Sequence, residues 1–133
     1  MREVFADTFY FVAVLGPEGE ERRSALEAGA THPGRMVTTE WVLTEVANFL
    51  HRPHEREAFV ALVTTLRASR EVVLLTSQEG LWQQGLNLYA NRLDKEWSLT
   101  DCISFVVMTD RGIADALTGD HHFEQAGFTA LLK

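Results

Sequence analysis

Four acidic residues of this chain have the types and positions to hold a divalent cation together; they are Asp7, Glu45, Asp101 and Asp120. Carboxylates placed close together raise one another's pKa and oppose folding, and a hard cation such as Mg²⁺ or Mn²⁺ reverses that effect. A cation held in this way can activate water and neutralise the charge that develops during attack on a phosphodiester. The four acids therefore indicate metal-dependent phosphodiester chemistry if the fold brings them to one place.

Each acid also has a purely structural interpretation. Asp7 could cap the helix that follows it, and Asp101 could be the acid of a capping box that Ser98 begins. Asp120 could be an ordinary loop residue. Glu45 is the hardest to explain in this way, because an acid on an apolar helical face costs desolvation unless a partner compensates for it.

His121 and His122 follow Asp120 directly. They could contact phosphate or a second metal ion, and the simpler interpretation is an exposed pair on the surface.

The composition favours one soluble domain covering residues 1–133. The chain is 46% hydrophobic and 23% charged, with a single cysteine, Cys102, which suits a reducing cytoplasm and a place in the core. No stretch reads as a targeting signal or a membrane span. The net charge of −7 argues against broad adhesion to nucleic acid, so a polyanionic partner would have to be bound with the help of cations.

Apolar segments alternate with helical patterns, which is typical of an α/β domain with a parallel sheet. Strands are predicted at 3–6, 35–38, 71–75, 112–117 and 128–132, the third covered on both faces and the last at an edge. Helices are predicted at 8–15, 20–29, 40–50, 55–68, from 76 or 77 to 90, from the Ser98 cap through the apolar run 102–108, and as a short turn or helix at 121–125.

This alternation predicts where the acids lie. In right-handed β-α-β units the carboxyl ends of strands and the amino ends of helices share one edge of the sheet. Asp7 and Asp120 follow strands, and Asp101 lies in the first turn of a helix. Glu45 lies about 9 Å from its helix start at a rise of about 1.5 Å per residue, so all four carboxylates can reach this edge.

Large apolar side chains are predicted to pack inside. Phe49 belongs to the apolar face of the helix at 40–50, which Thr39 can cap. Phe9, Trp41 and Trp82 are expected to serve as packing residues and not as platforms for stacked bases.

The chain resembles the PIN-domain nucleases, and in particular the VapC-type toxin ribonucleases of bacterial toxin-antitoxin pairs. The similar segments span nearly the whole chain. They are FADTFYFVAVL with Asp7, TTEWVLTEVANFL with Glu45, DKEWSLTDCISFVVM with Asp101 and IADALTGDHHFEQAGF with Asp120. Each segment alone is a weak signal, and the four in this order at this chain length form a strong one.

The resemblance implies a three-layer α/β/α fold whose mainly parallel five-stranded sheet has the order 3-2-1-4-5. It implies an endoribonuclease in which Asp7, Glu45, Asp101 and Asp120 carry one or two Mg²⁺ or Mn²⁺ ions. Where many relatives have a further acid after the last aspartate, this chain has His121, His122 and Phe123.

The same resemblance implies an RNA substrate, a homodimer and a small antitoxin partner. Residues that could position water, phosphate or substrate are Thr8, Thr118, Arg92 and Lys95, with His121 and His122 beside them. The two basic residues are chosen because they precede the Asp101 helix, and either could simply belong to a solvated face.

Two alternatives remain at this point. A PIN-like domain could bind RNA or protein without cutting it. A phosphoacceptor receiver domain also places an aspartate at a strand end beside Mg²⁺. The receiver requires an acidic pair near the first strand and a lysine after a late strand, whereas the only lysines here are Lys95 and Lys133.

Overall fold

Five parallel strands form the centre of the protein in the computed structural model, which describes residues 2–133. The strands are β1 (Val4–Ala6), β2 (Met36–Thr39), β3 (Val72–Leu75), β4 (Asp115–Leu117) and β5 (Thr129–Ala130), in the order β3-β2-β1-β4-β5. This order confirms the prediction. Every strand pair is parallel, so the sheet is wholly parallel and not mainly parallel as predicted. Receiver domains have the order 2-1-3-4-5, so the sheet excludes that alternative.

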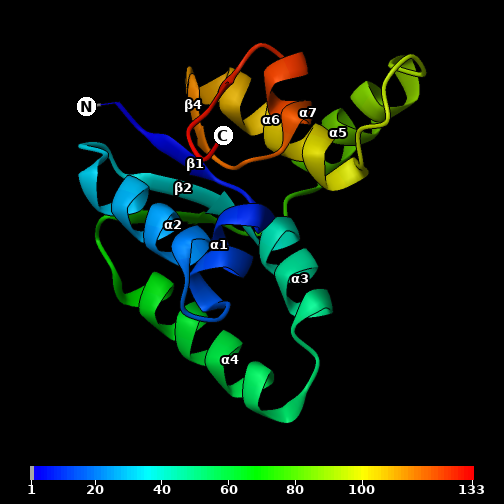
Figure 1. The fold of residues 1–133 in the computed structure, drawn as a ribbon. Helices are drawn as coiled ribbons and strands as arrows, with labels where there is room; N and C mark the ends of the chain where they lie inside the picture. Colours follow the sequence, from blue (N-terminus) through cyan, green and yellow to red (C-terminus); the bar gives the residue numbers. More distant parts are fainter. Residues whose placement is uncertain (1) are drawn as a thin grey trace.

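Helices cover both faces of the sheet. They are α1 (Thr8–Leu15), α2 (Glu20–Thr31), α3 (Glu40–Phe49), α4 (Pro53–Ala68), α5 (Glu79–Asn91), α6 (Leu99–Arg111) and α7 (His121–Gln125). Figure 1 shows α1, α2 and α4 on one side and α6 and α7 on the other, which confirms the three-layer α/β/α prediction. Among residues 2–133, no helix combines the length and apolar character that crossing a bilayer requires.

The register of the sheet places the ends of β1 and β4 side by side. Ala6 pairs with Leu117, the last residue of each strand, and the Asp7 backbone N–H donates to the Leu117 carbonyl at 3.3 Å. Both strands are buried along their central residues, because helices cover the two faces here. The residues that follow, Asp7 and Thr118, are therefore neighbours at the carboxyl edge of the sheet.

Helix caps deliver two further segments to this edge. The side chain of Thr39 accepts a hydrogen bond from the Val42 backbone N–H at 3.1 Å and begins α3, as predicted. Ser98 and Asp101 form the predicted capping box at the start of α6, with hydrogen bonds of 3.0 and 3.2 Å. The caps fix the helix starts and so fix where Glu45 and Asp101 lie.

Several predicted boundaries were wrong. Helix α4 starts at Pro53 and not at residue 55, because proline suits the first helical position. Helix α5 starts at Glu79 and not at 76 or 77, because the Ser77 backbone N–H and hydroxyl both donate to Glu40. Helix α6 extends beyond the predicted apolar run and ends at Gly112, which has a positive φ of 67°. Strand β4 therefore starts at Asp115 and not at the predicted residue 112. At the edge, β5 is only two residues long.

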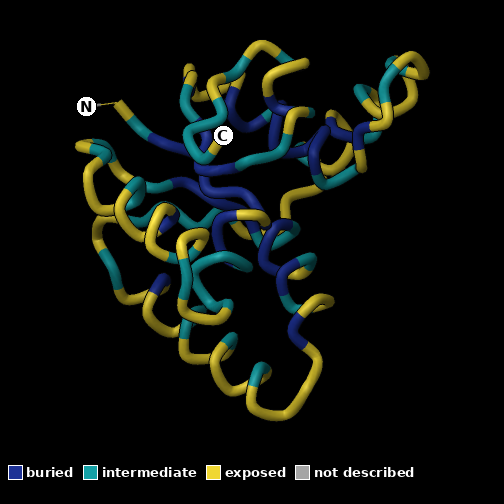
Figure 2. Tube along the Cα trace, in the orientation of Figure 1, coloured by how far each residue is buried: buried dark blue, intermediate teal, exposed yellow. Residues whose placement is uncertain are grey.

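Some large side chains predicted to be buried are exposed, as the yellow segments of Figure 2 illustrate for the outer helices. The exposed fraction is 62% for Phe49, 42% for Phe9 and 41% for Trp82. Phe49 is the last residue of α3, and α5 turns Gly85 and not Trp82 toward α6. Strand β3, predicted to be covered on both faces, is only half-buried; it lies at one edge of the sheet, where one of its sides has no neighbouring strand.

Candidate metal centre

Asp7 lies at the N-cap position of α1, yet its side chain forms no capping hydrogen bond. The residue is only 3% exposed. Its Oδ2 accepts a hydrogen bond from the Thr118 hydroxyl at 2.9 Å, and its Oδ1 is buried with no hydrogen-bond partner among the described residues. Burial, reinforced by the charge of Asp101, raises the pKa of Asp7 to about 7. Oδ1 of Asp7 is therefore an acceptor without a partner, and a role in capping α1 does not explain it.

Asp101 lies in the first turn of α6 and is also buried. One of its oxygens accepts the Ser98 backbone N–H, so the structural interpretation of this residue holds in part. Its pKa is raised by burial and, to a smaller extent, by the charges of Asp120 and Glu45. The capping bond occupies Oδ2 and leaves the carboxylate charge facing other carboxylates.

Glu45 lies on α3 and is half-buried, and its Oε1 accepts the Thr8 hydroxyl at 2.6 Å. This bond supplies the partner that an acid on an apolar helical face requires. Its charge also raises the pKa of Asp7 and of Asp101, which places it near both. The hydroxyl of Thr8 thus orients an acid of the site.

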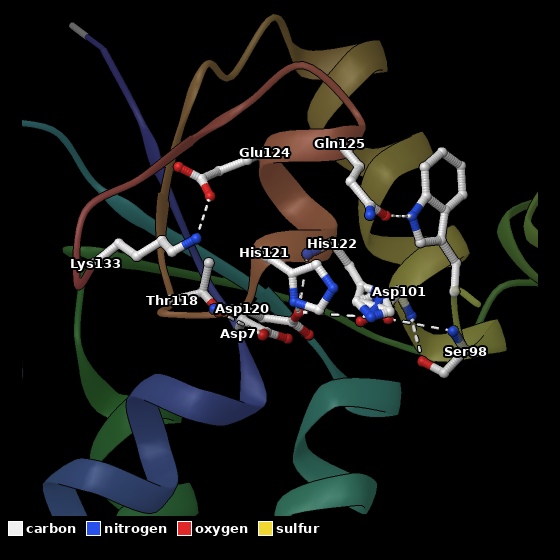
Figure 3. A network of polar contacts seen from close by, with 11 residues as sticks. Asp7, Ser98, Asp101, Thr118, Asp120, His121, His122, Glu124, Gln125 and Lys133 are labelled. Carbon is white, nitrogen blue, oxygen red and sulfur yellow. Dashed lines mark hydrogen bonds and ion pairs between the residues drawn. The ribbon is translucent and has the colours of Figure 1, made fainter. Parts of the chain in front are cut away.

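Asp120 begins α7, where its Oδ1 accepts the His122 backbone N–H at 2.9 Å. Its own backbone N–H donates to the Thr118 hydroxyl at 3.1 Å. The Thr118 hydroxyl, which is buried, therefore connects Asp7 to Asp120 through two hydrogen bonds, as Figure 3 shows. Asp120 is a cap as well as an acid of this edge.

The four acids thus gather at one edge of the sheet, although they do not form one tight cluster. Within residues 2–133, the one set of three ligating side chains whose atoms lie within 4.8 Å of one another is Asp120, His121 and His122. Asp7, Glu45 and Asp101 stand further apart. Mg²⁺ keeps several of its waters when proteins bind it, so this wider spacing suits a hydrated ion.

The donor set fits Mg²⁺ or Mn²⁺. All four groups are carboxylates, which hard divalent cations prefer, and the unpartnered Oδ1 of Asp7 is the kind of buried acceptor that a cation satisfies. Burial is the main cause of the raised pKa values of Asp7 and Asp101, and neighbouring carboxylates add to it, so a bound cation would offset both effects.

The predicted basic residues have other contacts. Arg92 forms two hydrogen bonds to Asp94 and lies over the Trp97 ring at 4.9 Å. Lys95 is half-buried and forms no ion pair among the residues that the structure describes. The structure therefore shows neither side chain in contact with the four carboxylates.

The two histidines differ from each other, and the prediction of an exposed pair was wrong for one of them. The His121 side chain is 61% exposed, whereas that of His122 is 17% exposed and lies next to Asp120. Helix α7 has only five residues and buries Phe123 fully, so its neighbour turns partly inward. In the sequence, only the neighbouring Phe123 could have indicated that His122 turns inward.

A large hollow lies beside these acids and not over them. It is lined by apolar residues of α1, by the turn between α1 and α2, by the start of α2, by the end of α3 and by the start of α4. Phe9 lines it, and the same ring packs against Gly119 of the loop that carries Asp120. None of the four acids lines this hollow, so it is not the candidate site.

We expect Thr118→Val to lower the free energy of unfolding by about 1–3 kcal/mol, because it leaves Asp7 Oδ2 and the Asp120 backbone N–H without their buried partner. Urea unfolding in EDTA would measure this. Thr64→Val is the matched control, since that hydroxyl bonds only an exposed helical carbonyl, and its effect should stay within about 0.5 kcal/mol. Equal effects of the two substitutions would contradict the bridging role.

Comparison with known proteins gives consistent results. The sequence matches the PIN domain family over residues 4–129. It is 32% identical over 126 residues to the 23S rRNA-specific endonuclease VapC20 of Mycobacterium tuberculosis, in strains CDC 1551 / Oshkosh and ATCC 25618 / H37Rv, covering 94% of this chain and 95% of the relative. The crystal structure of Mycobacterium tuberculosis VapC20, described as a sarcin-ricin loop cleaving toxin, superimposes with a TM-score of 0.84 at 28% identity, covering 95% of this chain and 96% of that chain.

Proposed function

Because the chain belongs to the PIN-domain family, we propose that it is a divalent-metal-dependent endoribonuclease and the toxin of a toxin-antitoxin pair, acting as one domain. The observation that carries this proposal is the gathering of Asp7, Glu45, Asp101 and Asp120 at one edge of the sheet, with Asp7 Oδ1 buried and unpartnered. The four sequence segments that contain these acids indicated the same family.

Asp7, Glu45, Asp101 and Asp120 would hold the ion. When bound, Mg²⁺ or Mn²⁺ supplies activation of water and neutralisation of the charge that develops on the scissile phosphate. Because the protein has a net charge of −7, this neutralisation also offsets its repulsion of a polyanion.

Three hydroxyl or amide groups of the chain keep the carboxylates in place. Thr8 holds Glu45, Thr118 holds Asp7, and the Ser98 backbone holds Asp101. Each of these bonds engages one oxygen of its acid, so the other remains available to a cation. Arg92 and Lys95 do not contact the four carboxylates and would bind phosphates away from the cleaved bond.

The substrate class we propose is a stem-loop of ribosomal RNA. The relative that spans nearly the whole chain is named as specific for 23S rRNA, and the structural neighbour is described as cleaving the sarcin-ricin loop. An RNA hairpin presents splayed loop bases and a phosphate backbone that a metal site at a sheet edge can approach. We propose that the protein acts on this target in the cytoplasm.

The test is a cleavage assay on a synthetic sarcin-ricin hairpin and on a hairpin with the same stem and a scrambled loop. We expect cleavage of the first hairpin with Mn²⁺ or Mg²⁺, no cleavage in EDTA and weaker cleavage of the scrambled loop. Equal cleavage of both hairpins would retain the ribonuclease and reject the substrate. Absence of metal-dependent cleavage of any RNA would favour a PIN-like module that binds without cutting.

The proposal includes a homodimer that pairs through α5. Trp82 and Tyr89 are two helical turns apart, so they share a face, and they are 41% and 47% exposed. Leu93, just beyond the helix, is 89% exposed. Figure 1 shows α5 projecting beyond the sheet, where a second copy could reach it. An exposed apolar stripe of this kind is typical of an interface.

We expect Trp82→Glu to weaken self-association by at least about thirtyfold, because a buried interface tryptophan contributes about 2 kcal/mol or more. Sedimentation analysis across a concentration series would measure it. Val60→Glu is the matched control, since Val60 is 62% exposed on α4 on the far side of the sheet. A monomeric wild-type protein, or equal effects of both variants, would reject this dimer.

The proposed antitoxin is a small protein that blocks the acidic edge. Its support is the relative's description as a toxin. Co-purification with the product of a short neighbouring reading frame, and inhibition of cleavage by that product, would test the pairing.

A further inference from the structure

Three consecutive side chains at the start of α7 converge on one point. His121 Nδ1 lies 3.7 Å and His122 Nε2 lies 3.9 Å from the same oxygen, Asp120 Oδ1. The two imidazole rings have their centroids 4.3 Å apart. Figure 3 shows the two rings beside the Asp120 carboxylate, at the end of the acidic edge that carries Asp101.

The arrangement is held by contacts that the histidine rings do not make. Asp120 accepts the His122 backbone N–H, and Phe123 anchors α7 in the core. Farther along the helix, Gln125 accepts the Trp97 indole N–H at 3.1 Å, and Glu124 pairs with Lys133 at 2.7 Å. The backbone that presents the three side chains is therefore fixed independently of them.

The two imidazole rings lie at ion-pair distance from the Asp120 carboxylate and are not hydrogen-bonded to it. Distances of 3.7 and 3.9 Å to Asp120 exceed hydrogen-bond length, and neither ring forms a side-chain hydrogen bond within residues 2–133. His122 Nδ1 is buried and unpartnered there as well. A buried polar atom without a partner is costly, which applies to the His122 ring, whereas the His121 ring is exposed and free to bind a ligand beside the Asp120 carboxylate.

We propose that Asp120, His121 and His122 bind a divalent transition-metal ion that accepts nitrogen ligands, of the class of Co²⁺, Ni²⁺ and Zn²⁺. Ligand atoms bonded to one ion at about 2.1 Å lie at most about 4.2 Å apart, so the separations from Asp120 Oδ1 already suit a shared ion. Imidazole favours these ions, whereas Mg²⁺ favours oxygen. The site shares Asp120 with the proposed carboxylate centre and differs from it in chemistry.

The site would give the protein a metal preference that the four acids alone do not have. An ion bound here lies next to the carboxylate centre. When transition metals are present, they would bind at the histidine site, and Mg²⁺ would bind at the carboxylates. Binding at this site does not depend on RNA cleavage, so it can be tested even if the proposed ribonuclease function fails.

The experiment is calorimetric titration of the tag-free protein with Zn²⁺, together with the visible absorption of bound Co²⁺. His121→Ala removes one ligand from an exposed position where the fold does not depend on it, and we expect it to weaken Zn²⁺ binding at least about tenfold and to alter the Co²⁺ spectrum. His54→Ala, an exposed histidine of α4, is the matched control and should bind as the wild type does.

A second variant separates the two centres. Asp7→Asn should impair binding of Mg²⁺ and leave the Co²⁺ spectrum unchanged, because Asp7 is not part of the histidine site. Zn²⁺ affinity of His121→Ala within twofold of the wild type, or a Co²⁺ spectrum lost in Asp7→Asn and kept in His121→Ala, would overturn the proposal.

Discussion

Asp7→Asn is expected to lower metal-dependent RNA cleavage by at least about a hundredfold, because it removes the most buried carboxylate of the proposed centre. The asparagine carbonyl can still accept the Thr118 hydroxyl, so the loop between β4 and α7 keeps its anchor. The substitution therefore removes the negative charge of this side chain and keeps its size and its hydrogen bond. Cleavage of the ribosomal hairpin at saturating Mn²⁺ measures the effect.

The same variant should fold at least as stably as the wild type in EDTA. Asp101→Asn shares this expectation, because both changes relieve repulsion between carboxylates. Asp110→Asn is the control for both measurements, since Asp110 is an exposed acid at the end of α6. A large fall in the melting temperature of Asp7→Asn and Asp101→Asn, with cleavage by correctly folded protein unchanged, would mean that these acids serve structure and not catalysis.

The position of the acidic edge could be predicted from sequence because local rules determine it. A short apolar strand followed by an acid predicts Asp7 at a strand end, and the spacing of Ser98 and Asp101 predicts a capping box. Parallel strands with helical crossovers bring these positions to one side of the sheet. The alternation of elements therefore sufficed to predict that distant acids share an edge.

The contacts that organise this edge could not be predicted, because they join residues far apart in the chain. The Thr118 hydroxyl reaches Asp7 across 111 positions, and Thr8 reaches Glu45 across 37. The exposure of Trp82 depends on which face of α5 packs against α6, which periodicity leaves open when both faces carry apolar residues. The inward turn of His122 depends on how Phe123 enters the core.

The apo protein is expected to lose stability as the pH rises from 5 to 8. The pKa of Asp7 is raised from 3.8 to about 7, so the folded state binds a proton that the unfolded state has released. Stability from this proton is fully present below pH 3.8 and is lost as the pH rises through about 7. The loss between pH 5 and 8 amounts to at most about 3 kcal/mol, and the raised pKa of Asp101 adds to it in the same direction.

Mn²⁺ or Mg²⁺ should reverse this trend, because a cation competes with the proton for the same carboxylates. At about 100 times its dissociation constant the ion adds about 2.7 kcal/mol, which raises the melting temperature by several degrees at pH 8 and by much less at pH 5. Melting curves in EDTA and in millimolar Mn²⁺ across this pH range test both halves of the prediction. Asp7→Asn should flatten the EDTA profile and reduce the metal response. Stability in EDTA that rises with pH, or a melting temperature that millimolar metal leaves unchanged at pH 8, would contradict a cation site at these carboxylates.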